Sequence, residues 1–421
     1  MVALLRLFVP FVLFPLASAA GFRLAPASLK LKLFALINVL GVLGLCLLSS
    51  MNGIYFWQLK AVLLVAVPVF VLYLLMVVLH YVLMRMYACR AGWVPWMAFL
   101  FPIAVMLAVK YVPGVDEPFR ASLAFIGKKH IAGFFVGISY TAFRLSYMVI
   151  EVRNGLVPMP TFWEHLSFGF FVPIMSVGPI SRYSVFRRSL YAPDRRQTPI
   201  GQCLLRLLVG ITKYLFLASM IEQISYNGLL FDNHPHRWID LPVAAVAFYI
   251  YLYLNFSGYC DMAIGAAGLL GIQVDENFDG PFMARNIQEF WTRWHITLSN
   301  YLRDTVFSPL SKALIRKMGP RAAPHAIAIS IFAVFVAIGA WHGLAWNFLI
   351  YGAIHGVGVV SCHYYTIWLR NHLGKAGYAA YHRNPWIKAA AVTVTFLFAA
   401  GSLFFFANTL EDAHKIMTVL R

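Results

Sequence analysis

The chain has 421 residues, of which 61% are hydrophobic and 12% are charged. A typical soluble chain is about 45–50% apolar and about 25% charged, so this composition excludes an ordinary soluble protein and predicts a polytopic membrane protein. Because the bilayer core holds no water, backbone groups there must bond within helices, which excludes open sheets. Apolar runs extend almost end to end, so we expect one integral-membrane domain over residues 1–421.

The formal net charge of +18 comes in clusters beside apolar segments. An excess of Lys and Arg on cytoplasmic loops orients membrane helices, and this bias explains the clusters without a ligand. A second role, attracting anionic lipids or an acidic cytosolic carrier protein, is compatible with it. Nucleic-acid binding is not expected, because the basic residues are tied to membrane edges. Two clusters stand out, namely Arg182, Arg187, Arg188, Arg195 and Arg196, and then Lys312, Arg316, Lys317 and Arg321.

About eleven or twelve apolar segments follow one another, each near the ~20 residues that cross a bilayer. The first, Val2–Ala20, ends in LASAA, which is similar to a signal-peptidase site; cleavage is one alternative, and a retained first helix is the one we expect. The sequence therefore predicts an all-α polytopic fold of about eleven transmembrane or re-entrant helices. The other segments lie at about 32–49, 59–84, 92–112, 130–150, 163–181, 200–224, 241–257, 258–272, 323–341, 343–368 and 386–408.

Proline interrupts several of these segments, at Pro68, at Pro102 and at Pro173. Proline removes a backbone donor and kinks a helix, which membranes tolerate where protein or a cavity satisfies the backbone. The run VPIMSVGPISRY is therefore expected to end a helix in a turn, with Arg182 just beyond.

The stretch around which the chain is organised is Phe290–Asp304, FWTRWHITLSNYLRD, which follows the acidic, turn-rich loop DENFDG at 275–280. A single helix is predicted here, with Glu289 and Arg293 forming a favourable i,i+4 pair. Its polar stripe either faces water at the membrane interface or lines a buried chamber. On a 3.6-residue period, the apolar stripe is Phe290, Trp291, Trp294, Leu298, Tyr301 and Leu302, and the polar one Glu289, Arg293, Thr297, Asn300 and Asp304.

Among thirteen histidines, His342 differs because it lies in an apolar run that begins near Ala326 and holds no other charge. Ionisable groups at membrane depth are costly and mark functional sites; the alternative is a neutral histidine hydrogen-bonded within a helix bundle. We expect His342 and His295 to face one buried reaction chamber. A histidine there can take a proton from a hydroxyl as its oxygen attacks an activated carbonyl, a contribution of about 10²–10⁴-fold.

Other chemistry has no support in the sequence. His342 and His355 are thirteen residues apart, which is not a zinc spacing, and HExxH, GxSxG, Walker and dinucleotide motifs do not occur. Five scattered cysteines form neither a CxxC pair nor a disulfide framework. No metal and no bound cofactor are therefore expected.

Five blocks of the chain, in order, resemble the membrane-bound O-acyltransferase family, over a core of about residues 130–360. They lean in part toward the branch that transfers D-alanyl groups to teichoic acid and in part toward the alginate-type O-acetylation branch. In the acetylating branch, the sequence PLGG often follows the Arg-Asp pair that corresponds to Arg303 and Asp304. Residues 307–311 of this chain, FSPLS, differ from that sequence. The blocks are GISYTAFRLSYMVIEVRNG (137–155), FFVPIMSVGPISRY (170–183), NFSGYCDMAIGAAGLLGIQVDENFDGPF (255–282), NIQEFWTRWHITLSNYLRD (286–304) and GAWHGLAWNFLIYGAIHG (339–356).

The resemblance implies a central tunnel, with acyl groups arriving from a cytosolic thioester donor (carrier-protein phosphopantetheine or acyl-CoA) and leaving on an extracytoplasmic glycan hydroxyl, directly or through a partner protein. The setting would be the bacterial inner membrane, among its lipids. The family's nearly invariant histidine falls on His342, the expected general base, and its second on His295. Weaker candidates for substrate binding are Asn300, Arg303, Asp304, Arg182, Asn347 and Trp294, with packing or membrane topology as the alternative for each.

Two other classes remain open. A transporter or flippase for a lipid-linked or small anionic substrate would move substrate without consuming a thioester. A membrane scaffold for a separate enzyme would leave the activity of the complex unchanged when both histidines are replaced.

Overall fold

A computed structural model describes residues 7–50, 59–112, 137–191, 199–226 and 238–419. These residues form helices and no strand; one isolated bridge joins Phe278 to Trp294. The all-α prediction is therefore confirmed. The chain separates into two compact units, Met1–Ile211 with Tyr259–Asp275, and Thr212–Gly258 with Glu276–Arg421, and each is described by itself. Arg195, Arg196 and residues 130–136 of one expected span lie outside the described residues.

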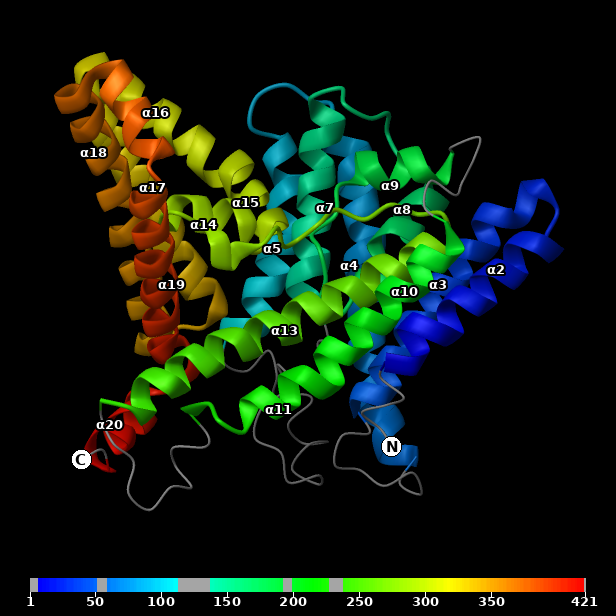
Figure 1. Ribbon diagram of the computed structural model, residues 1–421. Helices are drawn as coiled ribbons and strands as arrows, with labels where there is room; N and C mark the ends of the chain where they lie inside the picture. The colour runs from blue at the N-terminus through cyan, green and yellow to red at the C-terminus, as the bar shows by residue number, and fades with distance from the viewer. Residues whose placement is uncertain (1–6, 51–58, 113–136, 192–198, 227–237, 420–421) are drawn as a thin grey trace. The chain divides into compact units, whose positions relative to one another are not determined.

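In Figure 1, the part of the first unit up to Ile211 is coloured from blue to green. Its elements are η1 (Val9–Leu13), α2 (Phe14–Leu24), α3 (Ala27–Ser50), α4 (Leu59–Tyr87), α5 (Pro95–Tyr111), α7 (Ile138–Arg153), α8 (Phe162–Gly169), η3 (Val172–Ile174), α9 (Tyr183–Leu190) and α10 (Ile200–Ile211). Helix α13 (Asp240–Leu269) contributes its residues up to Gly258 to the second unit and the rest to the first.

The second unit carries the two histidines. Its elements are η4 (Thr212–Leu217), α11 (Ala218–Glu222), η5 (Pro281–Met283), α14 (Ile287–Arg293), α15 (Ile296–Leu302), η6 (Arg303–Phe307), α16 (Ser308–Met318), η7 (Pro320–Ala322), α17 (Ala323–His342), α18 (Trp346–Arg383), α19 (Pro385–Ala407) and α20 (Leu410–Val419).

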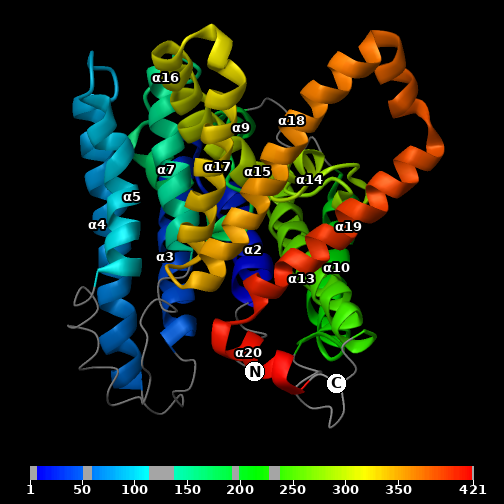
Figure 2. The ribbon, with the colours of Figure 1, turned by 90° about the vertical axis from the view of Figure 1, so that its left-hand side faces the viewer.

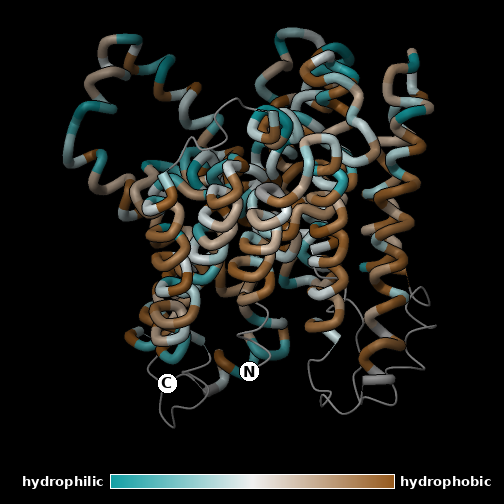
Figure 3. Tube along the Cα trace, turned by 90° about the vertical axis from the view of Figure 1, so that its right-hand side faces the viewer, coloured by the Kyte–Doolittle hydropathy of each residue, from teal (hydrophilic) through white to brown (hydrophobic). Residues whose placement is uncertain are grey.

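Six described helices are long and apolar enough to cross a membrane, which confirms a multi-pass protein. Figure 3 shows hydrophobic residues predominating along them. Many of their large apolar side chains are exposed, as expected of surfaces that face lipid rather than water. The six are 27–50, 62–87, 200–222, 240–269, 320–342 and 385–407.

The structure differs from the predicted spans in two places. The segment 163–181 is only the eight-residue α8 followed by the single turn η3, because Gly169 and Pro173 end the helix that a capping box at Thr161 begins. The segments 241–257 and 258–272 are one continuous helix, α13, since Gly258 does not break it. Helices α4 and α5 also continue through their prolines, which membrane helices tolerate.

In the first unit, the resembling blocks 137–155 and 170–183 contact each other. Glu151 of α7 is buried and accepts hydrogen bonds from the backbone nitrogens of Tyr183 and Ser184, which are the first residues of α9. Arg144 is fully buried, and its guanidinium donates to the carbonyls of Phe168 and Gly169. Buried charges need such partners, so polar contacts join α7 to α8 and α9.

In the second unit, two glycines bring α17 and α18 together. A Cβ on Gly339 would lie 2.4 Å from the carbonyl oxygen of Phe348, and one on Gly352 would lie 2.5 Å from that of Phe335. Small residues allow membrane helices to approach this closely. The glycines of the 339–356 block therefore fix the end of α17, where His342 lies.

Helix α18 is not straight. Gly374 has φ +60°, ψ −176°, a conformation that favours glycine, and it divides α18 into two helical pieces. Figure 2 shows the resulting arch, in which the chain turns back toward α19. Tyr365 and Tyr381, on the two pieces, join their hydroxyls at 3.1 Å.

Candidate functional site

The segment Phe290–Asp304 is not the single helix that its periodicity predicts. Helix α14 ends at Arg293, α15 begins at Ile296, and the backbone turns at His295. His295 has φ 45°, and no other non-glycine residue among those described has a positive φ. Holding a side chain in this left-handed region costs about 1–3 kcal/mol, so tertiary contacts must maintain the turn.

Asn277 supplies these contacts. Its side-chain oxygen lies 3.2 Å from the backbone nitrogen of Thr297, 2.8 Å from the Thr297 hydroxyl and 3.2 Å from Nδ1 of His295. A backbone N–H only donates, so the atom that it meets on Asn277 must be the amide oxygen. That oxygen only accepts, so Nδ1 of His295 must carry the ring proton. The neutral ring therefore leaves Nε2 as the nitrogen that can accept a proton.

The environment of His295 keeps it neutral. The side chain is 5% exposed, and the ring of Phe256 packs edge-on at 4.8 Å. His295 lies outside the six helices able to span a membrane. Burial first, and then the charge of His342, lower the pKa of His295 to about 3. The two histidines thus lie near enough for their charges to interact, and that they face one reaction chamber stays a prediction.

His342 is the last residue of α17 and is half-buried. The ring of Phe406 stands perpendicular to it at 4.9 Å, and the ring of Phe348 lies near-parallel at 6.1 Å. An imidazolium formed here would lie at a helix C-terminus, where the carbonyl groups stabilise positive charge by about 0.3–1 kcal/mol.

Asn347 is buried in the first turn of α18. It is not on the helix of His342, because α17 ends at His342 and α18 begins at Trp346. As a substrate contact Asn347 stays a prediction.

The other buried histidine of this unit is structural. Nδ1 of His355 accepts from the indole N–H of Trp291 at 3.2 Å, so the ring proton lies on Nε2, which donates to the Ser402 hydroxyl at 2.9 Å. Ser402 in turn donates to the carbonyl of Ala399. Both ring nitrogens of His355 are thereby used to join α14, α18 and α19.

The weaker candidates on α14, α15 and η6 divide between two settings. Asn300 and Arg303 line a cavity of about 290 Å³ between these elements and α17–α18, but neither His295 nor His342 lines it. Asp304 pairs with Arg303 at 3.2 Å. Trp294 is buried and stacks on Phe290 at 5.5 Å, which is the packing role weighed for it. Substrate contacts for these four residues stay predictions.

Arg182 belongs to the first unit, whereas both histidines belong to the second. Its backbone nitrogen donates to Asp275, and its guanidinium lies over the ring of Tyr147 at 5.1 Å. The stacking shows how the side chain is held; its predicted role toward a donor phosphate stays a prediction.

Sequence reasoning missed Asn277 and its contact with Thr297. The loop that holds Asn277 was interpreted only as a turn, and Thr297 was assigned to a polar stripe that faces either water or a buried chamber; it is buried and bonds to Asn277. The pair Glu289–Arg293 was predicted correctly, at 3.0 Å. The available signal for Asn277 was an amide in a loop directly before the histidine-bearing segment.

The fold and this arrangement define an integral membrane protein with two interacting histidines beside a helix end. The sequence model of the family described as "MBOAT, membrane-bound O-acyltransferase family" matches residues 138–399. The chain belongs to this family, whose members are O-acyltransferases. Its resemblance to the family, noted above from five blocks, is thereby confirmed.

Several characterised relatives are similar to the chain. A teichoic acid D-alanyltransferase of Streptococcus thermophilus is 31% identical, over 66% of this chain and 69% of that protein. A peptidoglycan O-acetyltransferase of Helicobacter pylori is 28% identical, over 64% of this chain and 49% of its own length. A probable alginate O-acetylase, AlgI, of Pseudomonas aeruginosa is 30% identical, over 53% and 41% respectively.

Proposed function

We propose that the protein transfers an acyl group from a thioester donor to a hydroxyl of a cell-envelope or exported polysaccharide. The family supplies the reaction type, and the named relatives act on teichoic acid, peptidoglycan and alginate. The observation that carries the catalytic assignment is the pair of histidines with different surroundings, His295 buried and neutral, and His342 half-buried at a helix end.

In this proposal His342 is the general base. Its ring takes the proton of the acceptor hydroxyl as that oxygen attacks the thioester carbonyl. The tetrahedral intermediate collapses, the C–S bond breaks, and the leaving sulfur takes the proton back from the imidazolium. The C-terminal carbonyl groups of α17 stabilise the cation between these steps, and base catalysis of this kind contributes about 10²–10⁴-fold.

His295 has a different role, because it stays neutral near a group that becomes charged. With Nδ1 held as a donor to Asn277, its Nε2 faces away from that amide as an acceptor. A hydrogen-bond acceptor at this point can orient the hydroxyl of the glycan substrate toward the thioester carbonyl. Alignment of two substrates can reach effective molarities of about 10⁵–10⁸ M, so the orientation of His295 matters to the rate.

The donor is proposed to be an acyl group on carrier-protein phosphopantetheine or on coenzyme A at the cytosolic face of a bacterial inner membrane. Helix α16 and η7 carry Lys312, Arg316, Lys317 and Arg321, all of them exposed. Such a face attracts an acidic carrier protein. The chain covers more of the D-alanyltransferase than of the acetylating relatives, so D-alanyl donors are the first to test and acetyl donors the second.

The test is acyl transfer by purified protein in proteoliposomes, with acyl-carrier and acyl-CoA donors supplied separately. His342→Ala should lower the rate at least a hundredfold while folding and insertion are unchanged, and His295→Ala should lower it as well. His372, an exposed histidine of α18, provides the matched control as His372→Ala. A normal rate for His342→Ala would refute the assignment of His342 as the general base.

The same preparation distinguishes an acyltransferase from the two other classes of protein, a transporter and a scaffold. Substrate flux without consumption of thioester would support a transporter, and unchanged activity of the complex after loss of both histidines would support a scaffold. For the donor, Lys312→Glu with Arg316→Glu should raise KM for the carrier-bound donor and leave KM for acyl-CoA unchanged.

A further inference from the structure

A long groove lies in the second unit, between α18 and α19. It holds a cavity of about 990 Å³, whose lining includes the segment 285–287. The walls are almost entirely apolar. Residues that represent them are Ile350, Ile354 and Val357 from α18, and Ala391, Val394 and Phe398 from α19.

One wall of the groove is apolar enough to face lipid. It is formed by helix α19, which is one of the six helices that can span a membrane. Val394 and Val357 at the groove are 67% and 56% exposed, which in water would be costly. In a bilayer, an apolar groove beside α19 is filled by a hydrocarbon chain.

The length of the groove fits one leaflet. Along α19 it is lined from Ile387 to Phe398, which are eleven residues apart, or about 16 Å at 1.5 Å per residue. The hydrocarbon core of a bilayer is about 30 Å thick, so one leaflet is about 15 Å. The groove therefore spans about half of the membrane and takes a chain from one side.

The end of the groove near the start of α19 is polar and cationic. A smaller adjoining cavity there is lined by Arg285, Lys388 and His382, together with the bonded hydroxyls of Tyr365 and Tyr381, and none of its lining residues is acidic. An exposed Trp386 begins α19 beside it, as aromatic residues do where helices enter the membrane interface.

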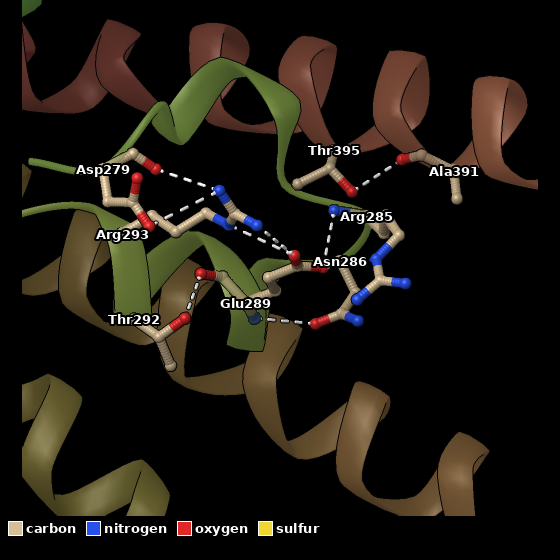
Figure 4. A network of polar contacts seen from close by, with 8 residues as sticks. All are labelled: Asp279, Arg285, Asn286, Glu289, Thr292, Arg293, Ala391 and Thr395. Atoms are coloured by element: carbon tan, nitrogen blue, oxygen red, sulfur yellow. Dashed lines mark hydrogen bonds and ion pairs between the residues drawn. The ribbon is translucent and has the colours of Figure 1, made fainter. Parts of the chain in front are cut away.

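Arg285 is held so that its terminal nitrogens remain available. Its Nε donates to Glu289 at 2.9 Å, and Glu289 is shared with Arg293, which also contacts Asp279. Figure 4 shows this network with Arg285 beside Thr395 and Ala391 of α19. The side chain is 45% exposed, and among the described residues no protein acceptor engages its two Nη groups.

We propose that this groove binds one anionic phospholipid, its acyl chain between α18 and α19 and its phosphate at Arg285 and Lys388. Arginine binds phosphate through paired donors, and lysine adds a point charge. One of the two tyrosine hydroxyls donates to the other, so the pair offers one O–H to the same headgroup. The site is separate from the proposed acyl transfer and does not depend on it.

The experiment uses the full chain, delipidated in detergent, and native mass spectrometry with phosphatidylglycerol or phosphatidylcholine of identical acyl chains. Phosphatidylglycerol should bind the tighter. Arg285→Gln with Lys388→Gln should weaken it about twenty- to thirtyfold, because each basic side chain near an anionic lipid contributes about fivefold. Arg383→Gln, at an exposed arginine nearby that lines neither cavity, is the control for losing a positive charge outside the site and should change nothing.

A second pair of variants tests the groove itself. Val394→Trp should fill it and abolish tight binding of either lipid, whereas Leu397→Trp, on an exposed position of the same helix that does not line the cavity, should leave binding intact. Equal affinity for the two lipids would refute the proposal that Arg285 and Lys388 select an anionic headgroup. If Val394→Trp elutes as folded protein and binds lipid as tightly as the parent, the proposal that the acyl chain lies in the groove is refuted.

Discussion

Replacing Asn277 by alanine tests how the orientation of His295 arises. The variant removes one buried acceptor that serves three donors, Nδ1–H of His295 and both the backbone N–H and the hydroxyl of Thr297. A buried donor left without its partner costs about 1–3 kcal/mol. For the histidine alone this corresponds to a rate about five- to 150-fold lower, and the two Thr297 donors add a loss of stability of a similar size.

Asn277→Asp separates orientation from stability. The carboxylate keeps an acceptor for Nδ1–H, so turnover near neutral pH should stay close to that of the parent. Its negative charge should raise the pKa of His295 from about 3, so the activity of the variant should fall more steeply on acidification than that of the parent. The assay is kcat and KM in proteoliposomes between pH 5 and 8, with thermal unfolding in parallel. An aspartate variant as slow as the alanine variant, with an unchanged pH profile, would refute the argument.

Three further predictions concern stability, each measured by thermal unfolding in detergent. Gly339→Ala should destabilise the protein by about 1–3 kcal/mol and lower activity, because its Cβ would meet the carbonyl oxygen of Phe348; Gly401→Ala, where nothing lies within 4 Å, is the matched control and should be neutral or stabilising. Arg144→Met should cost about 1.5–3 kcal/mol, since two buried carbonyls lose a charged donor. Because the folded pKa of His295 lies below its ordinary 6.5, the unfolded state binds the proton first, and this residue should lower stability by about 1.6 kcal/mol from pH 6.5 to 5. His295→Gln should remove its share of the pH dependence, and an unchanged slope would contradict the argument.

The sequence was sufficient for the membrane class and the family. Composition and hydrophobic length are summed over many residues, so errors at single positions do not change them. The burial of Phe290, Trp294 and Leu298 followed from periodicity for the same reason, and it holds although the helix is broken between them.

The break itself could not be predicted locally. A 3.6-residue period continues through His295 because the apolar side chains on both sides of the turn enter one core. What ends the helix is an amide eighteen residues earlier in the chain, whose contacts repay the strained backbone. Likewise, hydropathy could not show that 163–181 is a short helix and a turn, since its apolar residues are buried among other helices rather than facing lipid.

The strain at His295 has a consequence for the two proposed roles. A histidine in a regular helix is free to choose between tautomers, and either ring nitrogen can present a lone pair. At the left-handed position the ring meets an oxygen that can only accept, so one tautomer is selected before any substrate arrives. The rings of Phe406 and Phe348 pack against His342, which in the proposed function is the group that gains and returns a proton. The division of labour between a fixed and a titrating histidine therefore follows from the backbone turn that the periodicity of the sequence did not reveal.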